Sequence, residues 1–120
     1  MERRISLIVD DEPAIRSYIR AVLERECFEA VEADSGKRGL EILEDLGDDV
    51  DLIVSDINLP EGDGLSFART AAKAFPAVPI VLVSGYFASN EVLPFEFVEK
   101  PFSPTALLRA VHKVVGQSVA

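Results

Sequence analysis

The chain has 120 residues, so one domain spanning residues 1–120 is expected. Hydrophobic residues make up 48% and charged residues 28%, with 7 Gly and 7 Pro, which excludes disordered, collagen-like and repeat architectures. The 12 basic and 21 acidic residues give a formal net charge of −9, which repels phosphate backbones and anionic lipids. We therefore expect no direct nucleic-acid partner and no membrane partner.

The N-terminus has the basic residues Arg3 and Arg4, but the apolar run after them is too short for an export signal. No stretch approaches the roughly 18 apolar residues of a membrane span. The single cysteine, Cys27, has no internal disulfide partner and is expected to be a small buried residue where the first helix ends. These features predict a cytoplasmic protein.

Apolar runs alternate with segments of helical period along the chain, which is typical of βαβ units and a parallel sheet. In chain order, the first half predicts strand Ile5–Val9, a helix from Pro13 that buries Ile15, Ile19, Val22 and Leu23, strand Phe28–Ala33, a helix capped by Ser35 that ends at Gly47, and strand Asp51–Ser55. The second half predicts a helix after Gly62 and Gly64 that ends before Pro76, strand Pro79–Ser84, strand Phe95–Glu99, and a helix capped by Ser103 that ends before Gly116.

The composition of the strands predicts their order in the sheet. Three strands are uninterrupted apolar runs, which suits strands buried on both faces, whereas the second and fifth carry glutamates and suit the edges. With right-handed crossovers this gives a doubly wound, five-stranded parallel sheet of order 2-1-3-4-5 with helices on both faces. Because only Gly85 to Pro94 separates the last two strands, we expect the fourth helix to be shortened or absent.

Polar side chains follow the ends of four predicted strands. Asp10 and Asp11 follow the first, Asp56 the third, Ser84 ends the fourth, and Lys100 follows the fifth. Parallel strands bring these residues to one edge of the sheet, where three carboxylates repel each other unless a cation neutralises them. An all-oxygen donor set suits Mg²⁺, and a carboxylate beside it can attack a phosphoryl group, with Lys100 and Ser84 bonding the phosphoryl oxygens.

The segments VDDE, VSDINLP with GDGL, SG after the fourth strand, and EKPF, in this order, resemble the receiver domain of two-component response regulators, which has a flavodoxin-like fold. The resemblance covers essentially the whole chain. It implies that Asp56 is the phosphoacceptor and that Asp10, Asp11, Asp56 and the backbone carbonyl of Asn58 bind Mg²⁺. It also implies that Ser84 and Phe97 are switch residues, that Lys100 contacts the phosphoryl group, and that a cis bond precedes Pro101.

The segment after Ser84 departs from most receivers. With Gly85 and Tyr86 it partly resembles the atypical FAT GUY single-domain subclass, whose fourth helix is reduced. Such a segment must cover the last two strands with its own apolar side chains, which makes it a candidate partner surface. The residues of that predicted surface are Tyr86, Phe87, Val92 and Leu93.

The resemblance implies a histidine kinase or histidine phosphotransfer protein as phosphodonor and a downstream protein as target. The resemblance also implies that the domain is not an enzyme, since it catalyses only its own phosphorylation and dephosphorylation. The sequence does not resemble an aspartate-nucleophile phosphohydrolase, because those enzymes carry the nucleophile on the first strand and have a cap domain. Two alternatives stay open: a receiver fragment of a larger regulator or hybrid kinase, and a phosphorylation-independent interaction module.

Overall fold

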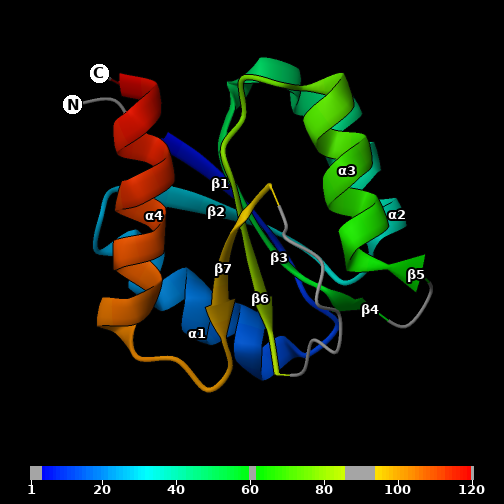
Figure 1. Cartoon of the computed structure of the whole chain (residues 1–120). Coiled ribbons are helices and arrows are strands. Elements are labelled where there is room, and N and C mark those ends of the chain that lie inside the picture. Colours follow the sequence, from blue (N-terminus) through cyan, green and yellow to red (C-terminus); the bar gives the residue numbers. More distant parts are fainter. Residues whose placement is uncertain (1–3, 60–61, 86–93, 120) are drawn as a thin grey trace.

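The computed structural model describes residues 4–59, 62–85 and 94–119 (Figure 1). Five parallel strands form one sheet in the order β2-β1-β3-β6-β7. The strands are β1 (Arg4–Val9), β2 (Phe28–Ala33), β3 (Val50–Asp56), β6 (Ile80–Ser84) and β7 (Glu96–Glu99). This confirms the predicted order 2-1-3-4-5, with the two glutamate-bearing strands at the edges.

Helices cover both faces of the sheet (Figure 1). On one side lie α1 (Pro13–Glu24) and α4 (Pro104–Val119), and on the other lie α2 (Gly36–Leu46) and α3 (Gly64–Ala74), with a 3-10 turn, η1 (Gly47–Asp49), after α2. The predicted reduction of a further helix between β6 and β7 concerns residues 86–93, which lie outside the described residues. In the described ranges, no helix has both the length and the apolar character to cross a lipid bilayer.

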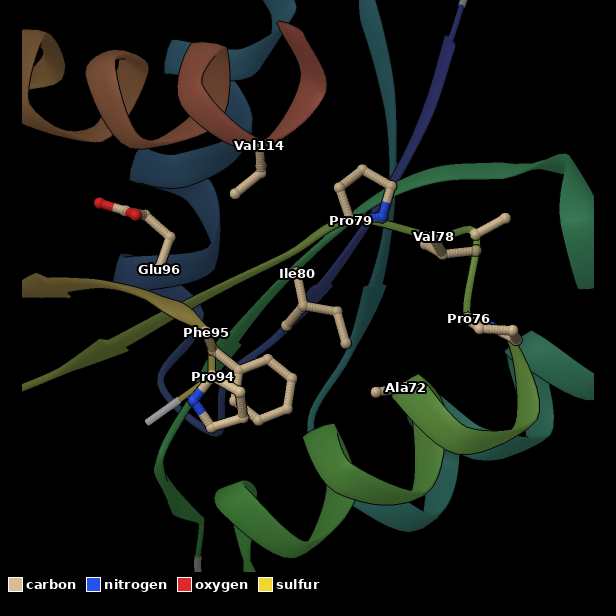
Figure 2. Close-up of a pocket in the computed structure, with 10 residues that line it drawn as sticks. Ala72, Pro76, Val78, Pro79, Ile80, Pro94, Phe95, Glu96 and Val114 are labelled. Atoms are coloured by element: carbon tan, nitrogen blue, oxygen red, sulfur yellow. The ribbon is translucent and has the colours of Figure 1, made fainter. Parts of the chain in front are cut away.

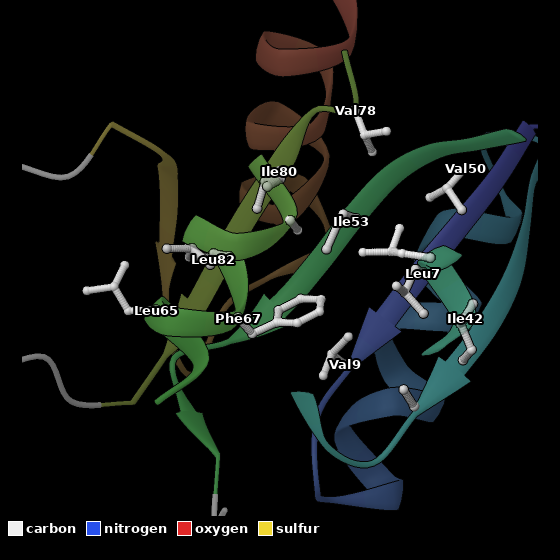
Figure 3. Close-up of a cluster of buried hydrophobic side chains, with 14 of the residues drawn as sticks. Leu7, Val9, Ile42, Val50, Ile53, Leu65, Phe67, Val78, Ile80 and Leu82 are labelled. Carbon is white, nitrogen blue, oxygen red and sulfur yellow. The ribbon is translucent and has the colours of Figure 1, made fainter. Parts of the chain in front are cut away.

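Alternate strand residues fill two separate cores, because successive side chains of a strand point to opposite faces. In β1, Leu7 and Val9 join the cluster under α2 and α3, while Ile8 between them joins the cluster under α1 and α4. The first cluster is drawn in Figure 3. Both faces of the central strands are therefore buried, which explains their continuous apolar sequence.

Two side-chain caps behave as the sequence predicts. Ser35 accepts the N–H of Arg38 at 3.1 Å at the start of α2, and Ser103 accepts the N–H of Ala106 at 3.1 Å at the start of α4. These bonds satisfy donors that the first helical turn leaves without a partner.

Two predictions from the sequence are wrong. Cys27 is exposed, because it adopts a left-handed backbone conformation, with φ of 64°, that turns the chain from α1 into β2; Phe28 after it is the buried residue. Gly116 does not end the last helix, which continues to Val119. An isolated glycine costs a helix only about 1 kcal/mol, so it is tolerated there.

A short ribbon that the sequence did not predict follows β3. Its antiparallel strands are β4 (Asn58–Leu59) and β5 (Gly62–Asp63), and α3 begins immediately after it. The N–H of Gly64 donates to the carbonyl oxygen of Ile57 at 2.7 Å. A Cβ on Gly64 would lie 1.9 Å from the carbonyl oxygen of Asp56, so glycine is needed where α3 packs against the end of β3.

We predict that Gly64→Ala lowers the free energy of unfolding by about 3 kcal/mol, because the added methyl group meets backbone that cannot move aside cheaply. Gly116→Ala is the matched control. A Cβ there meets nothing within 4 Å, so this change should be neutral or add up to about 1 kcal/mol. Urea unfolding of both variants measures the difference, and equal effects would contradict the close packing at Gly64.

Candidate functional site

Three carboxylates gather at the carboxyl edge of the sheet. Asp10 and Asp11 follow β1, and Asp56 is the last residue of the neighbouring strand β3. One carboxylate oxygen from each residue lies within 4.8 Å of the others. The structure therefore brings together the three acidic residues that the sequence singled out.

Burial makes this cluster costly without a cation. Asp10 has an exposed fraction of 0% and Asp56 of 4%, whereas Asp11 is exposed. Lys100 compensates in part: its Nζ lies 3.1 Å from Asp10 Oδ2 and 3.0 Å from Asp56 Oδ2. One ammonium thus bridges the two buried carboxylates, and such charge-assisted hydrogen bonds are the strong ones.

Lys100 is held in place from its backbone. Its N–H donates to the carbonyl oxygen of Ser84 at 2.8 Å, which continues the pairing of β6 with β7, and its peptide bond to Pro101 is cis. Burial lowers the pKa of the Lys100 ammonium, but hydrogen bonds to Asp56 and Asp10 and their charges outweigh this, so the pKa stands above its ordinary value. The side chain therefore stays charged at neutral pH.

Backbone donors orient both buried carboxylates. Asp10 Oδ1 accepts the N–H of Glu12 at 2.9 Å, and Asp56 Oδ1 accepts the N–H of Asn58 at 2.9 Å. In each case the donor lies two residues after the aspartate, and Lys100 holds the other oxygen. Each carboxylate is thus fixed from both sides.

Ser84 and Phe97 take different positions relative to this cluster. Ser84 ends β6 with an exposed fraction of 1%, and its Oγ accepts Nδ2–H of Asn58 at 2.7 Å. Phe97 pairs with Leu82 in the sheet and packs against the core under α2 and α3. The aromatic side chain is thus partly buried against this core, three residues before Lys100.

One contact of the site escaped the sequence analysis. Arg16 on α1 donates through Nη1 to the backbone oxygen of Asp10 at 2.7 Å and pairs through Nε with Glu32 of β2 at 2.9 Å. The sequence offered one signal for this contact, namely a basic residue on α1, Arg16, and an acidic residue near the end of the edge strand β2, Glu32. Arg16 therefore ties α1 and β2 to the backbone of the acidic cluster.

The predicted partner surface, Tyr86, Phe87, Val92 and Leu93, lies outside the described residues. A pocket of about 390 Å³ does lie at the opposite end of the sheet, between α3, α4 and the beginnings of β6 and β7 (Figure 2). Most of the residues that line it have apolar side chains, such as Pro79, Ile80 and Phe95, and Glu96 is ionisable. Its chemistry does not resemble that of the acidic cluster.

The acidic cluster fits a divalent cation. Its three carboxylates face one ammonium, so negative charge remains uncompensated. Within the described residues the group contains aspartates alone, and a donor set of oxygens suits Mg²⁺ rather than zinc or copper. Asp11, being exposed, leaves the cluster accessible from solvent.

We predict that Lys100→Met in the presence of a chelator lowers the free energy of unfolding by about 3 kcal/mol, because two buried carboxylates lose their ammonium. Lys113→Met is the control: this cation is 62% exposed and pairs with Glu96 at 3.3 Å, so its loss should cost less than about 1 kcal/mol. Chemical unfolding measures both. Addition of Mg²⁺ should recover part of the loss in Lys100→Met, whereas equal losses in the two variants would show that Lys100 contributes no more than a surface cation.

Comparison with known proteins places this site in a family. Residues 6–112 match the family described as response regulator receiver domain. The sensor kinase CckA of Brucella abortus (strain 2308) is 39% identical over 117 residues, which cover 91% of this chain and 12% of that kinase. The cell cycle response regulator CtrA of Brucella ovis is 31% identical over 93% of this chain and 50% of its own length.

A solved structure shows the same fold. The response regulator receiver protein from Sinorhizobium medicae WSM419 superposes with a TM-score of 0.86 at 31% identity and covers 98% of both chains. Receiver domains are phosphorylated by histidine kinases and are not conventional enzymes. Because the family match spans residues 6–112, the chain belongs to the response regulator receiver domain family.

Proposed function

We propose that this receiver domain takes a phosphoryl group from a phospho-histidine donor onto Asp56 in a Mg²⁺-dependent reaction and thereby switches the binding of a partner protein. One observation carries the proposal. The Asp56 carboxylate, at the end of the central strand, contacts the Lys100 ammonium at 3.0 Å and lies beside the carboxylates of Asp10 and Asp11.

Asp56 is the best placed of the three carboxylates to react. Asp10 has no exposed surface, so a donor cannot reach it. Asp11 is exposed, and among the described residues the carboxylates that Lys100 contacts are those of Asp10 and Asp56. Asp56 combines partial access with a cation against its carboxylate. That combination favours attack on a phosphoryl group, whose transition state needs neutralisation of charge more than acid or base groups.

The proposed step transfers a phosphoryl group between two residues. An oxygen of the Asp56 carboxylate attacks phosphorus, an O–P bond forms, and the P–N bond to the donor imidazole breaks. The imidazole nitrogen keeps the electron pair of that bond and takes up a proton. The product is an acyl phosphate on Asp56 and a neutral donor histidine.

We assign the metal site to Asp10, Asp11, Asp56 and the backbone carbonyl of Asn58. When bound, Mg²⁺ supplies positive charge to the oxygens of the phosphoryl group. Asp10 is already oriented for this role by the N–H of Glu12 and by Lys100. Its fixed position favours binding, since less ordering remains to be done when the ion enters.

Lys100 and Ser84 act on the phosphoryl oxygens in this proposal. The Lys100 ammonium, charged at neutral pH, stays beside Asp56 and can bond an oxygen of the transferred group. The Ser84 hydroxyl donates to another, and Phe97 follows as the second switch residue. Phe97 has no phenol hydroxyl, so its change of position rests on packing against the core under α2 and α3.

A surface beside Lys100 suits the approach of a donor protein. A pocket of about 610 Å³ lies between α1 and the connection from β7 to α4, lined by Ile15, Tyr18, Gly85, Lys100, Pro101 and Phe102. The Tyr18 hydroxyl donates to the Phe102 carbonyl oxygen at 2.8 Å, which fixes the two elements to each other. A largely apolar pocket bordering the ammonium that contacts Asp56 favours docking of a histidine kinase or a histidine phosphotransfer protein there.

A receiver domain can act alone or as part of a longer protein. We favour a single-domain regulator that acts on a downstream protein target in the cytoplasm. The alternative is a receiver within a larger regulator or hybrid kinase, as the chain covers 12% of CckA and 50% of CtrA. A phosphorylation-independent interaction module is the remaining alternative, and the next experiment distinguishes it.

Incubation with Mg²⁺ and a phosphorylated histidine kinase should give an acid-stable, base-labile phosphoprotein, because an acyl phosphate is hydrolysed readily by base. Asp56→Asn should give none, because the amide is no nucleophile. Asp45→Asn, on the exposed surface of α2, is the control and should be labelled like the wild type. Labelling of Asp56→Asn, or no labelling of the wild type by any donor, would contradict the proposal.

We also propose that the downstream partner binds the segment with Tyr86, Phe87, Val92 and Leu93, because this segment joins Ser84 to the strand of Phe97 in the sequence. Amide exchange with and without Mg²⁺ and beryllofluoride, a phosphoryl mimic, should change most between Gly85 and Phe97. Changes confined to α1 and α2, with that segment unaffected, would place the output on another face.

A further inference from the structure

Four residues, Asp56 among them, form a closed ring of hydrogen bonds. Asp56 Oδ1 accepts the backbone N–H of Asn58 at 2.9 Å, and Asn58 Nδ2 donates to Ser84 Oγ at 2.7 Å. The Ser84 carbonyl oxygen accepts the N–H of Lys100 at 2.8 Å, and Lys100 Nζ returns to Asp56 Oδ2 at 3.0 Å. Asn58 supplies the link between the carboxylate and the hydroxyl.

We propose that the side-chain amide of Asn58 restrains Ser84 in the unphosphorylated state and that a phosphoryl oxygen on Asp56 takes its place as the partner of the Ser84 hydroxyl. The inference rests on the proposed function, since it concerns the same site. It gives the side chain of Asn58 a positioning role that is separate from the role of its backbone carbonyl toward Mg²⁺.

The backbone around Ser84 leaves the side chain as the part that can move. Ser84 pairs with Glu99 in the sheet, its carbonyl oxygen is bonded to Lys100, and its exposed fraction is 1%. Ser84 Oγ is the acceptor toward Asn58, whereas its O–H would be the donor toward a phosphoryl oxygen, so the two bonds compete where Oγ has to move to reach the phosphoryl group. With the backbone held, that movement is a rotation about the Cα–Cβ bond. Such a rotation carries Oγ away from Asn58 Nδ2 and breaks the 2.7 Å bond.

The position of Asn58 suits a restraint that phosphorylation can release. Its backbone is tied to Asp56 and pairs with Asp63 in the ribbon that follows, so the amide is anchored beside the reacting carboxylate. The residue is exposed, so water can solvate the amide once it is released. Exchanging one hydrogen-bond partner for another in this way costs little, and the bond therefore tunes the switch without blocking it.

The test compares four proteins: the wild type, Asn58→Ala, Ser84→Ala and the double variant. The apparent affinity for beryllofluoride in Mg²⁺ is measured for each by titration. Because one net hydrogen bond changes an equilibrium constant by about twofold to tenfold, Asn58→Ala should bind the mimic tighter by that factor. In the Ser84→Ala background the same change should have no effect, since the restrained hydroxyl is gone.

A second measurement needs neither metal nor mimic. In chelator, unfolding of the same four proteins should show a coupling between Asn58 and Ser84 of about twofold to tenfold in the unfolding equilibrium constant. Asn58→Leu, similar in volume but without a donor, should behave as Asn58→Ala in both measurements. This variant separates loss of the hydrogen bond from loss of side-chain volume.

The outcomes separate the inference from the proposed function. If the wild type fails to bind beryllofluoride, the proposed function falls and the inference falls with it. If the wild type binds, and Asn58→Ala binds no tighter or gains equally in the Ser84→Ala background, the inference alone is wrong. Tighter binding that depends on Ser84, together with coupling in chelator, supports it.

Discussion

Two almost completely buried carboxylates share one ammonium at the carboxyl edge of the sheet, and much of the structure around them stabilises that arrangement. Asp10 and Asp56 have exposed fractions of 0% and 4%, and Lys100 reaches both at about 3 Å. Burying charge is expensive unless every group is paired and hydrogen-bonded. With Asp11 beside them the carboxylates carry more negative charge than the Lys100 ammonium compensates, and this donor set suits a divalent cation.

The fold supplies the constraint that keeps these charges together. Asp10 and Asp56 stand at the ends of adjacent parallel strands, and Lys100 follows an edge strand that is separated from β3 by β6. Two dry cores, one on each face, fix the strands, so the carboxylates cannot move apart to relieve repulsion. The backbone around Gly64 and the bond from Arg16 to Asp10 add further fixed points.

Regular features were predictable from the sequence because they depend on local pattern. The order of the strands followed from apolar runs and edge glutamates, and the caps at Ser35 and Ser103 followed from residue type. The small apolar side chain of Cys27 predicts burial, whereas the residue lies exposed, at positive φ, where the chain turns from α1 into β2. Glycine often ends helices, so the sequence predicts an end at Gly116, yet α4 continues past it to Val119.

In the candidate site, too, the sequence predicts the residues but not all of their contacts. Pattern and resemblance identified the residues at the strand ends, and the structure brings Asp10, Asp11, Asp56 and Lys100 together. The contacts of Arg16 with Asp10 and of Asn58 with Ser84 join residues whose pairing depends on side-chain direction, which the sequence pattern does not encode. These contacts are also the ones that suggest how the resting state of the site is held.

Chemical mapping of the modified residue decides whether Asp56 is the carboxylate that reacts. Borohydride reduces an aspartyl phosphate to homoserine, so reduction of the phosphorylated protein followed by peptide sequencing by mass spectrometry locates the acceptor. The arrangement of Lys100 and the two buried carboxylates predicts homoserine at position 56, with Asp10 and Asp11 unchanged. Homoserine at position 10 or 11, with Asp56 intact, would contradict it.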